Sequence, residues 1–275
     1  MVKDIVVNLS GRAAQDFAGD YAISVAATLG AHVAGLAFLY EPVIPDGTLG
    51  GIPVDLIELQ RDENSKVADA AVRRFEAAAK SAGVSAESRI VDASVGGAAT
   101  LFGRIARRFD IAIVGQAQRE HGAGEELMIE GVLFESGRPV IVVPYIQKSG
   151  IKLDRVLVCW DGGRTAARAI GDAMPLLERA KAVDILIITE ERKHDEVTGA
   201  NMSEHLARHH IPASIKRVAK GDVAVDEAIL SYTSDSGADF LVMGGYGHSR
   251  LREFILGGAT RGILDAMTIP VLMSH

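Results

Sequence analysis

The amino-acid sequence predicts an α/β protein built from two tandem units, each an open parallel sheet of five strands with helices on both faces. Three observations carry this prediction. Short apolar runs alternate with amphipathic stretches of helix length, the alternation occurs twice along the 275 residues, and segments of the first half recur in the second. Because parallel strands need connections of helix length, this order favours a mostly parallel sheet.

The first half contains five candidate strands, a helical pattern and one irregular segment. Apolar spacing near 3.6 predicts a helix that packs on a sheet, with Val67, Ala71, Phe75 and Ala78 on its inner face. Residues 41–53 are rich in proline and glycine and predict a long loop, either a recognition surface or a neutral insertion. The candidate strands are residues 5–7, 33–39, 89–91, 111–114 and 140–143.

The second half repeats this order of elements. Its candidate strands are residues 155–160, 185–189, 214–218, 240–243 and 271–273. Helical spacing follows the first of these strands, at Ala166, Ile170, Met174 and Leu177. Two pairs of similar segments indicate a duplication: FDIAIVG (109–115) with ADFLVMG (238–244), and RPVIV (138–142) with IPVLM (269–273).

The boundary between the two halves is predicted within residues 145–152. This segment is polar, contains glycine, and lies between the last strand of one half and the first strand of the next. We therefore expect one domain over residues 1–146 and a second domain over residues 153–275.

Composition excludes several classes of function. A formal net charge of -7 leaves no basic surface for a nucleic-acid backbone. No stretch approaches the roughly 18 apolar residues that span a bilayer, and the N-terminus lacks the apolar run of a signal peptide. The single cysteine, Cys159, cannot form an intrachain disulfide, which fits a reducing compartment. We expect a cytoplasmic protein with no nucleic-acid partner and no membrane partner.

The sharpest chemical signal is the glycine-rich segment 243–260, MGGYGHSRLREFILGGAT, which follows the fourth strand of the second half. Ligands of open α/β sheets bind beyond the carboxyl ends of the strands, where glycine lets backbone N–H groups approach a phosphate closely. The pair Gly257 and Gly258 precedes a helical pattern, and can present N–H donors and the positive end of a helix dipole to an anion. Two glycine turns could therefore hold a phosphate chain from both sides.

Two better-known phosphate motifs do not fit this segment. The P-loop needs Gly-Lys-Ser/Thr, and the sequence contains no Gly-Lys pair. The dinucleotide fingerprint needs a third glycine where Arg250 stands after Gly245 and Gly247, and it belongs after a first strand instead of a fourth.

Residues 153–275 resemble a universal stress protein domain, and the whole chain resembles the tandem two-domain form of that family. The order of strands and helices agrees. The family's nucleotide-binding motif, Gly-x2-Gly-x9-Gly-Ser/Thr, matches Gly244, Gly247 and Gly257, with Gly258 in the place of Ser or Thr. The resemblance implies an adenine-nucleotide alpha-hydrolase-like, Rossmann-like sheet in each domain, packing of the domains as a pseudo-dimer, and further dimerisation of the chain.

The resemblance also implies an adenine-nucleotide site in the second half. The expected ligand is ATP, with ADP or AMP as alternatives and Mg²⁺ as an accompanying ion. Asp161, at the end of the first strand of this half, is implied to hold the adenine or ribose edge, and Gly163 stands where the family usually has serine. The implied cofactor-binding residues are Asp161, Met243, Gly244, Gly247, His248, Gly257, Gly258 and Ala259.

The first half lacks the corresponding residues. Residues 115–118, GQAQ, lack the second glycine, and residues 7–11, VNLSG, lack the aspartate. Glu126 and Leu127 fall where Gly257 and Gly258 align, and they oppose a phosphate by charge and by bulk. We therefore expect a degenerate first domain and one nucleotide per chain.

Few other residues suggest chemistry. His205 and His209 are four apart and could ligate a metal, but a solvated helix face explains them as well. His248 either donates to a phosphate or lies in an exposed loop, and Trp160 lines a base pocket or belongs to the core. Cys159 lies in an apolar strand, where a thiol is usually inert, and no nucleophilic triad is visible. We predict no catalytic residue and no metal site.

The resemblance implies a stress-response sensor or signalling protein. In this hypothesis a nucleotide orders residues 244–257 and changes a surface that a protein partner contacts. Slow ATP hydrolysis is compatible with a phosphate site that has no clear base. Two alternatives remain open: a nucleotide-free interaction protein, and an ATP-using enzyme of the same broad α/β group.

Overall fold

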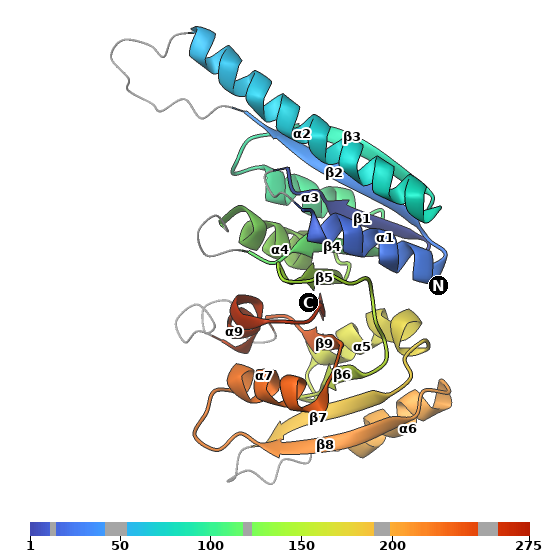
Figure 1. Cartoon of the computed structure of the whole chain (residues 1–275). Coiled ribbons are helices and arrows are strands. Elements are labelled where there is room, and N and C mark those ends of the chain that lie inside the picture. Colours follow the sequence, from blue (N-terminus) through green and yellow to red (C-terminus); the bar gives the residue numbers. More distant parts are fainter. Residues whose placement is uncertain (12–14, 42–53, 118–122, 190–198, 247–257) are drawn as a thin grey trace. The chain divides into compact units, whose positions relative to one another are not determined.

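Strands and helices alternate within each half of the described chain in the computed structural model, and β5 is followed directly by β6 (Figure 1). The structure describes residues 1–11, 15–41, 54–117, 123–189, 199–246 and 258–275, so most of the predicted loop, residues 42–53, lies outside it. All ten predicted strands are confirmed, with bounds that differ by a few residues. The strands are β1 (Asp4–Asn8), β2 (His32–Tyr40), β3 (Ala86–Ala93), β4 (Ile111–Gly115), β5 (Val140–Val143), β6 (Val156–Cys159), β7 (Val183–Thr189), β8 (Ala213–Ala219), β9 (Phe240–Gly244) and β10 (Val271–Ser274).

Helices connect these strands, as parallel crossovers require. They are α1 (Phe17–Leu29), α2 (Val54–Ala82), α3 (Ala98–Ala106), α4 (Ala123–Glu135), α5 (Arg164–Leu177), α6 (Gly199–Arg208), α7 (Val225–Ser236) and α9 (Ala259–Ala266). Across the described ranges, no helix combines the length and the apolar character needed to cross a bilayer.

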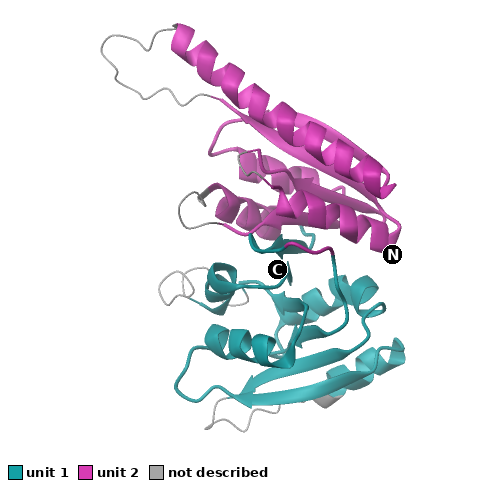
Figure 2. Ribbon diagram, in the orientation of Figure 1, with its two compact units in different colours: residues 1, 137–147, 151–275 teal, residues 2–136, 148–150 magenta. Residues whose placement is uncertain are grey.

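The chain divides into two compact units, drawn in different colours in Figure 2. Unit 2 consists of residues 2–136 and 148–150, and unit 1 consists of residues 1, 137–147 and 151–275. Strand β5 therefore belongs to unit 1, together with the elements of the second half. The domains 1–146 and 153–275, which follow the sequence duplication, stay a prediction.

Four parallel strands form the sheet of unit 2, in the order β3-β2-β1-β4. Strands β1 and β4 are apolar on both faces, and the side chains of Ile5 and Val7 are fully buried. This double burial explains why both strands are continuous apolar runs in the sequence. The predicted helical face is confirmed with a shift of one residue at each end, since α2 buries Ala68, Ala71, Phe75 and Ala79.

Six strands form the sheet of unit 1, in the order β5-β10-β9-β6-β7-β8. The five strands of the second half are parallel, as predicted. Strand β5 differs, because it runs antiparallel to β10 with Val142 opposite Val271 and Val140 opposite Met273. The alternation of strands and helices could not predict this pair, since no crossover connects these two strands.

The strand order of unit 1 changes direction between β6 and β9. From β6 the chain continues to β7 and β8 on one side, and it then returns to β9 and β10 on the other side. The carboxyl ends of β6 and β9, Cys159 and Gly244, are therefore neighbours. Open α/β sheets bind their ligands in the crevice at such a switch point.

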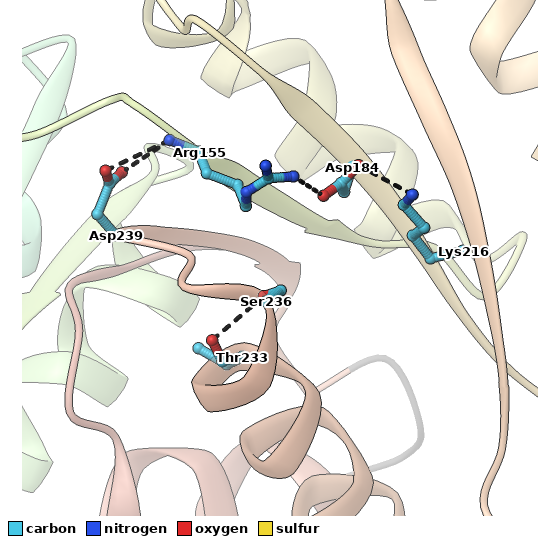
Figure 3. Close-up of polar contacts among 6 residues, drawn as sticks. All are labelled: Arg155, Asp184, Lys216, Thr233, Ser236 and Asp239. Carbon is cyan, nitrogen blue, oxygen red and sulfur yellow. Dashed lines mark hydrogen bonds and ion pairs between the residues drawn. The ribbon is translucent and has the colours of Figure 1, made fainter.

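A buried carboxylate lies near the amino ends of the same strands, away from this crevice (Figure 3). The Asp184 side chain on β7 is only 4% exposed, and Arg155 Nη1 donates to its Oδ2 at 2.7 Å. Lys216 Nζ on β8 lies 4.0 Å from its other oxygen. The backbone N–H of Arg155 donates to Asp239, before β9. A buried charge is costly unless it is paired, so Arg155 and Lys216 compensate for the burial of the Asp184 carboxylate.

Asp16 begins helix α1 and is almost completely buried. Its Oδ1 accepts a hydrogen bond from the N–H of Gly19 at 2.9 Å, and its Oδ2 accepts one from the N–H of Ser10 at 3.0 Å. Burial raises the pKa of the Asp16 carboxyl above its usual 3.8, although both hydrogen bonds and the charge of Arg74 act to lower it. Asp16 thus ties the end of β1 to the start of α1.

We expect Asp16→Ala to lower the free energy of unfolding by about 1–2 kcal/mol, because it removes the helix cap. Asp16→Asn keeps an acceptor oxygen and should cost less. Because the folded-state pKa is raised, the free energy of unfolding of the wild-type protein falls as the pH rises above about 4. The Asn variant has no carboxyl at this position and lacks this fall. In urea unfolding, the free energy of unfolding of the Asn variant relative to wild type should therefore be higher at pH 7 than at pH 4. A constant difference between the two proteins would contradict the assignment.

Candidate functional site

Asp161 lies just beyond the carboxyl end of β6. The pairing with β7 continues to Trp160, whose N–H donates to the carbonyl of Leu186 at 2.9 Å. The chain then turns at Gly162, whose φ of 77° favours glycine. Asp161 is exposed, and its Oδ1 accepts a hydrogen bond from the N–H of Gly163 at 2.7 Å. The loop between β6 and α5 therefore presents one carboxylate at the crevice, partly engaged by its own backbone.

Gly244 ends β9 in close contact with the first turn of α5. A Cβ atom added to Gly244 would lie 2.5 Å from Thr165 Oγ1 and 2.7 Å from the backbone nitrogen of Ala166. Any larger residue must therefore push the strand and the helix apart. From the sequence, we predicted only that glycine at position 244 lets a phosphate approach the backbone. The structure shows that packing against α5 already requires glycine there. Met243, the residue before it, is 5% exposed and belongs to the core.

The chain beyond β9 is held by the end of β10 and by the start of α9. The N–H of Gly245 donates to the carbonyl of Ser274 at 2.8 Å, and the N–H of Tyr246 donates to Thr260 Oγ1 at 3.0 Å. Thr260 is 3% exposed and lies in the first turn of α9. These contacts bring residue 246 close to the helix start. The predicted site residues Gly247, His248 and Gly257 lie outside the described residues.

Helix α9 begins at Gly258 without a side-chain cap. Gly258 is the N-cap residue, and among the described residues no side-chain cap bond is present at this helix start. Its carbonyl accepts from the N–H of Arg261 at 3.0 Å, and the first turn contains no acidic residue. Ala259 is the first helical residue and is partly exposed. An uncapped N-terminus with no acid attracts anions.

Unit 2 differs at the position of Asp161 and at the start of the helix that corresponds to α9. Ser10 stands at the place of Asp161, and its backbone is already used: its N–H donates to Asp16, and its carbonyl accepts from Arg74 Nη2 at 2.7 Å. Helix α4 begins at Ala123, so Glu126 lies inside the helix. Glu125 and Glu126 are both in its first turn and offset the positive end of the helix dipole. The end of β1 and the start of α4 thus lack the features that favour an anion.

Two residues of the site were missed by sequence reasoning. Thr165 touches Gly244, and Thr260 closes the turn after β9. Both are threonines in the first turn of a helix that follows a glycine. Such a threonine is common in sequences, and nothing in the residue types indicated that Thr165 would contact β9, a strand more than 70 residues later.

The described residues hold no cluster suited to a metal ion. No group of three or more His, Cys, Asp or Glu side chains gathers among them. The rings of His205 and His209 lie with their centroids 4.9 Å apart on the exposed face of α6. This geometry fits the interpretation of a solvated helix face, because two adjacent rings alone leave a metal ion incompletely coordinated.

Comparison with known proteins shows which proteins the chain is similar to. Residues 152–275 match the model of the universal stress protein family. The universal stress protein Slr1230 of Synechocystis sp. is 26% identical over 180 residues, which cover 60% of this chain and 57% of that protein. The matched part of the chain therefore spans a little over half the length of this relative.

Solved structures show the same fold. A universal stress protein from Archaeoglobus fulgidus aligns with a TM-score of 0.73 at 19% identity, over 98% of this chain and 95% of that chain. A protein of unknown function from Pseudomonas aeruginosa PAO1 aligns with a TM-score of 0.57 at 14% identity, over 99% and 92%. These similarities confirm the predicted α/β fold of the whole chain.

We expect Gly244→Ala to lower the free energy of unfolding by about 1–3 kcal/mol without any ligand, because the added Cβ overpacks the contact with Thr165. Gly171→Ala is the matched control. Gly171 lies inside α5 with nothing within 4 Å of an added Cβ, so alanine there should stabilise by about 0.5–1 kcal/mol. Chemical denaturation of both variants measures the difference, and equal effects would show that the close contact is absent.

The Cys159 thiol should be unreactive. Burial raises the pKa of this thiol to about 12, and the charge of Asp161 adds to the rise. At pH 8 we expect alkylation by iodoacetamide to be about a thousandfold slower than for an ordinary cysteine, because the thiolate is the nucleophile. The same protein unfolded in urea is the control. Equal rates in the folded and unfolded protein would contradict the burial of this sulfur.

Proposed function

We propose that unit 1 binds an adenine nucleotide, in the first place ATP, at the crevice between β6 and β9, since residues 152–275 match the model of the universal stress protein family. One observation carries this proposal. An exposed carboxylate follows β6, and an uncapped helix N-terminus follows β9, at neighbouring strand ends. A ribose or adenine edge offers hydrogen-bond donors to the carboxylate, and a phosphate accepts from the uncapped N–H groups.

Each residue of the proposed site has a role. Asp161 binds the ribose or the adenine edge, and the backbone of Gly258 and Ala259 donates to phosphate oxygens. Gly247 and Gly257 would let the backbone approach the phosphate chain, as the family motif implies, and His248 would donate to a phosphate oxygen. Met243 and Gly244 position the end of β9. Met243 packs in the core, and Gly244 contacts the first turn of α5. Mg²⁺ would accompany ATP as a ligand of its phosphates.

The proposed role is binding and signalling, without catalysis. Cys159, the one cysteine of the chain, lies half-buried at the end of β6, and burial raises the pKa of its thiol to about 12, so it supplies no thiolate nucleophile near neutral pH. In this proposal the nucleotide orders residues 244–257 and creates a surface for a protein partner in the cytoplasm, with dimerisation of the chain adding a second copy. Limited proteolysis within these residues should slow when ATP is added.

A nucleotide-free interaction protein is the second candidate. Two observations favour it: Gly258 has no hydroxyl to offer a phosphate, and Asp161 already accepts from the N–H of Gly163. An ATP-using enzyme would need steady turnover with a second substrate, which a coupled assay of ADP release would detect.

Calorimetric titration with Mg-ATP tests the proposal. We expect about one site per chain, lost in Gly247→Val because valine blocks close approach of a phosphate. Gly258→Ser restores a hydroxyl and should bind several-fold more tightly. Gly171→Val, at an open position of α5, is the matched control and should bind like wild type.

The other outcomes of the titration are equally decisive. Two sites per chain would contradict the loss of the site in unit 2. No binding by protein freed of copurified nucleotide would select the interaction protein.

A further inference from the structure

Strand β3 forms an edge of the sheet in unit 2 (Figure 1). It pairs with β2 along all eight residues without a break in register, and no strand of the described chain pairs with its other side. Natural proteins protect such edges with proline, bulges, short strands or charges. Strand β3 contains neither proline nor a bulge, so its charged side chains decide what this edge can pair with.

The hydrogen bonds to β2 fix which backbone groups of β3 point outward. The carbonyl of Ser85 accepts from the N–H of Val33 at 3.0 Å, and the carbonyl of Ala93 accepts from the N–H of Glu41 at 3.1 Å. In a parallel ladder every second residue bonds to a given neighbour, so the odd-numbered residues bond to β2. The even-numbered residues therefore direct their N–H and C=O groups to the open edge, and they are Ala86, Ser88, Ile90 and Asp92.

The two exposed charges Glu87 and Arg89 lie on one face of this edge. Their side chains are 44% and 62% exposed, and Arg89 Nη2 lies 3.2 Å from Glu87 Oε1. Residues two apart in a strand share a face, and the residue between them points to the other face. That residue is Ser88, whose hydroxyl donates to Glu76 of α2. The edge thus carries one acid and one base at equal distances from Ser88.

A two-fold axis at Ser88 makes this pattern self-complementary. In a symmetric antiparallel pair of strands, each residue lies opposite the residue equally far on the other side of the axis. Glu87 then lies opposite Arg89 of the second copy, and Arg89 lies opposite Glu87 of that copy. Both are non-hydrogen-bonded pairs, in which side chains are closer, and opposite charges in such pairs stabilise the sheet.

Neighbouring registers lack this complementarity. An axis at Glu87 or at Arg89 places like charges directly opposite each other, which is destabilising. An axis at Ile90 places Arg89 opposite Val91, without a charge partner. With the axis at Ser88, the Ile90 side chain, which is 39% exposed, lies opposite Ala86, whose methyl group leaves room for it.

Strand β8, the edge of the sheet in unit 1, has a different charge pattern. It carries Lys216 and Arg217 and no acidic residue. A second copy of β8 therefore offers no opposite charge to these two side chains. The self-complementary pattern belongs to β3 and is not a general property of the sheet edges of this chain.

We propose that β3 pairs with β3 of a second copy of this chain, antiparallel about a two-fold axis at Ser88. Backbone hydrogen bonds of the even-numbered residues and two symmetry-related pairs of Glu87 with Arg89 hold the copies together. This interface gives a surface to the dimerisation that accompanies the proposed function. It uses residues of unit 2 alone, so it does not depend on the proposed nucleotide site.

Sedimentation equilibrium of the full chain, without nucleotide, measures the dissociation constant of this dimer. Arg89→Glu and Glu87→Arg should each raise the constant by about fivefold or more, because each variant places like charges opposite each other twice. The double exchange E87R/R89E restores both pairs and should restore the wild-type constant. Arg208→Glu is the matched control, since Arg208 pairs with Glu204 at an exposed site of α6 and its reversal should leave the constant unchanged.

A mixture of the two single variants separates charge pairing from misfolding. Arg89→Glu leaves two acidic residues at the edge, and Glu87→Arg leaves two basic residues, so every charge meets its opposite in the mixed pair. The two variants should therefore bind each other more tightly than either binds itself. Both variants keep a negative net charge, so overall attraction between the chains does not explain such a preference.

A cysteine at the axis tests the register. In a hydrogen-bonded antiparallel pair the two Cα atoms at position 88 lie about 5.5 Å apart, within the range of a disulfide. Oxidation of Ser88→Cys should therefore give a covalent dimer. In Ile90→Cys, the control, the two Cα atoms lie about 14 Å apart along the strands and should not be linked. Burial raises the pKa of the native Cys159 thiol to about 12, which keeps it out of this reaction.

Three results would overturn the proposal. A wild-type chain that stays monomeric at every concentration would leave this edge to an extended peptide of another protein. A dimer whose dissociation constant is the same in both single variants, or one that is linked through Ile90→Cys and not through Ser88→Cys, would use another surface. Calorimetric titration with Mg-ATP is independent of these outcomes, so either proposal can fail while the other stands.

Discussion

The contact between Gly244 and the first turn of α5 is the constraint on which the site in unit 1 depends. It joins the end of β9 to the start of the helix that follows β6, so the ends of these two strands lie side by side at the strand-order switch. A glycine is required because the helix backbone approaches within the space of a single Cβ. The same contact holds the Thr165 hydroxyl against the end of β9, beside the crevice.

The two halves of the chain share one fold but carry different residues at the corresponding strand ends. In unit 1 the strand ends at the crevice carry an exposed carboxylate and an uncapped helix. In unit 2 the corresponding backbone is engaged by Asp16 and Arg74, and acidic residues stand in the first turn of α4. Stability and binding compete for the same groups, because a backbone N–H that caps a helix or pairs with a buried acid is not available to a ligand.

Sequence reasoning predicted the strands well because most of them are buried on both faces and form continuous apolar runs, such as Val156–Cys159. It located Asp161 and Gly258 beyond the ends of β6 and β9, where the structure has them. It did not foresee the antiparallel pair of β5 with β10, nor the contact of Thr165 with Gly244. Both depend on residues far apart in the chain that share no local pattern.

By itself, the sequence determined the α/β class, the duplication and the asymmetry between the two halves, because periodicity, repeats and missing glycines are properties of local residue order. Only the tertiary structure decided which strand ends are neighbours, why Gly244 must be glycine, and that Arg164 and Thr165 share a concavity with His275, the last residue of the chain. The physical reason is that sheet order and helix packing bring together side chains whose separation along the chain exceeds any local period.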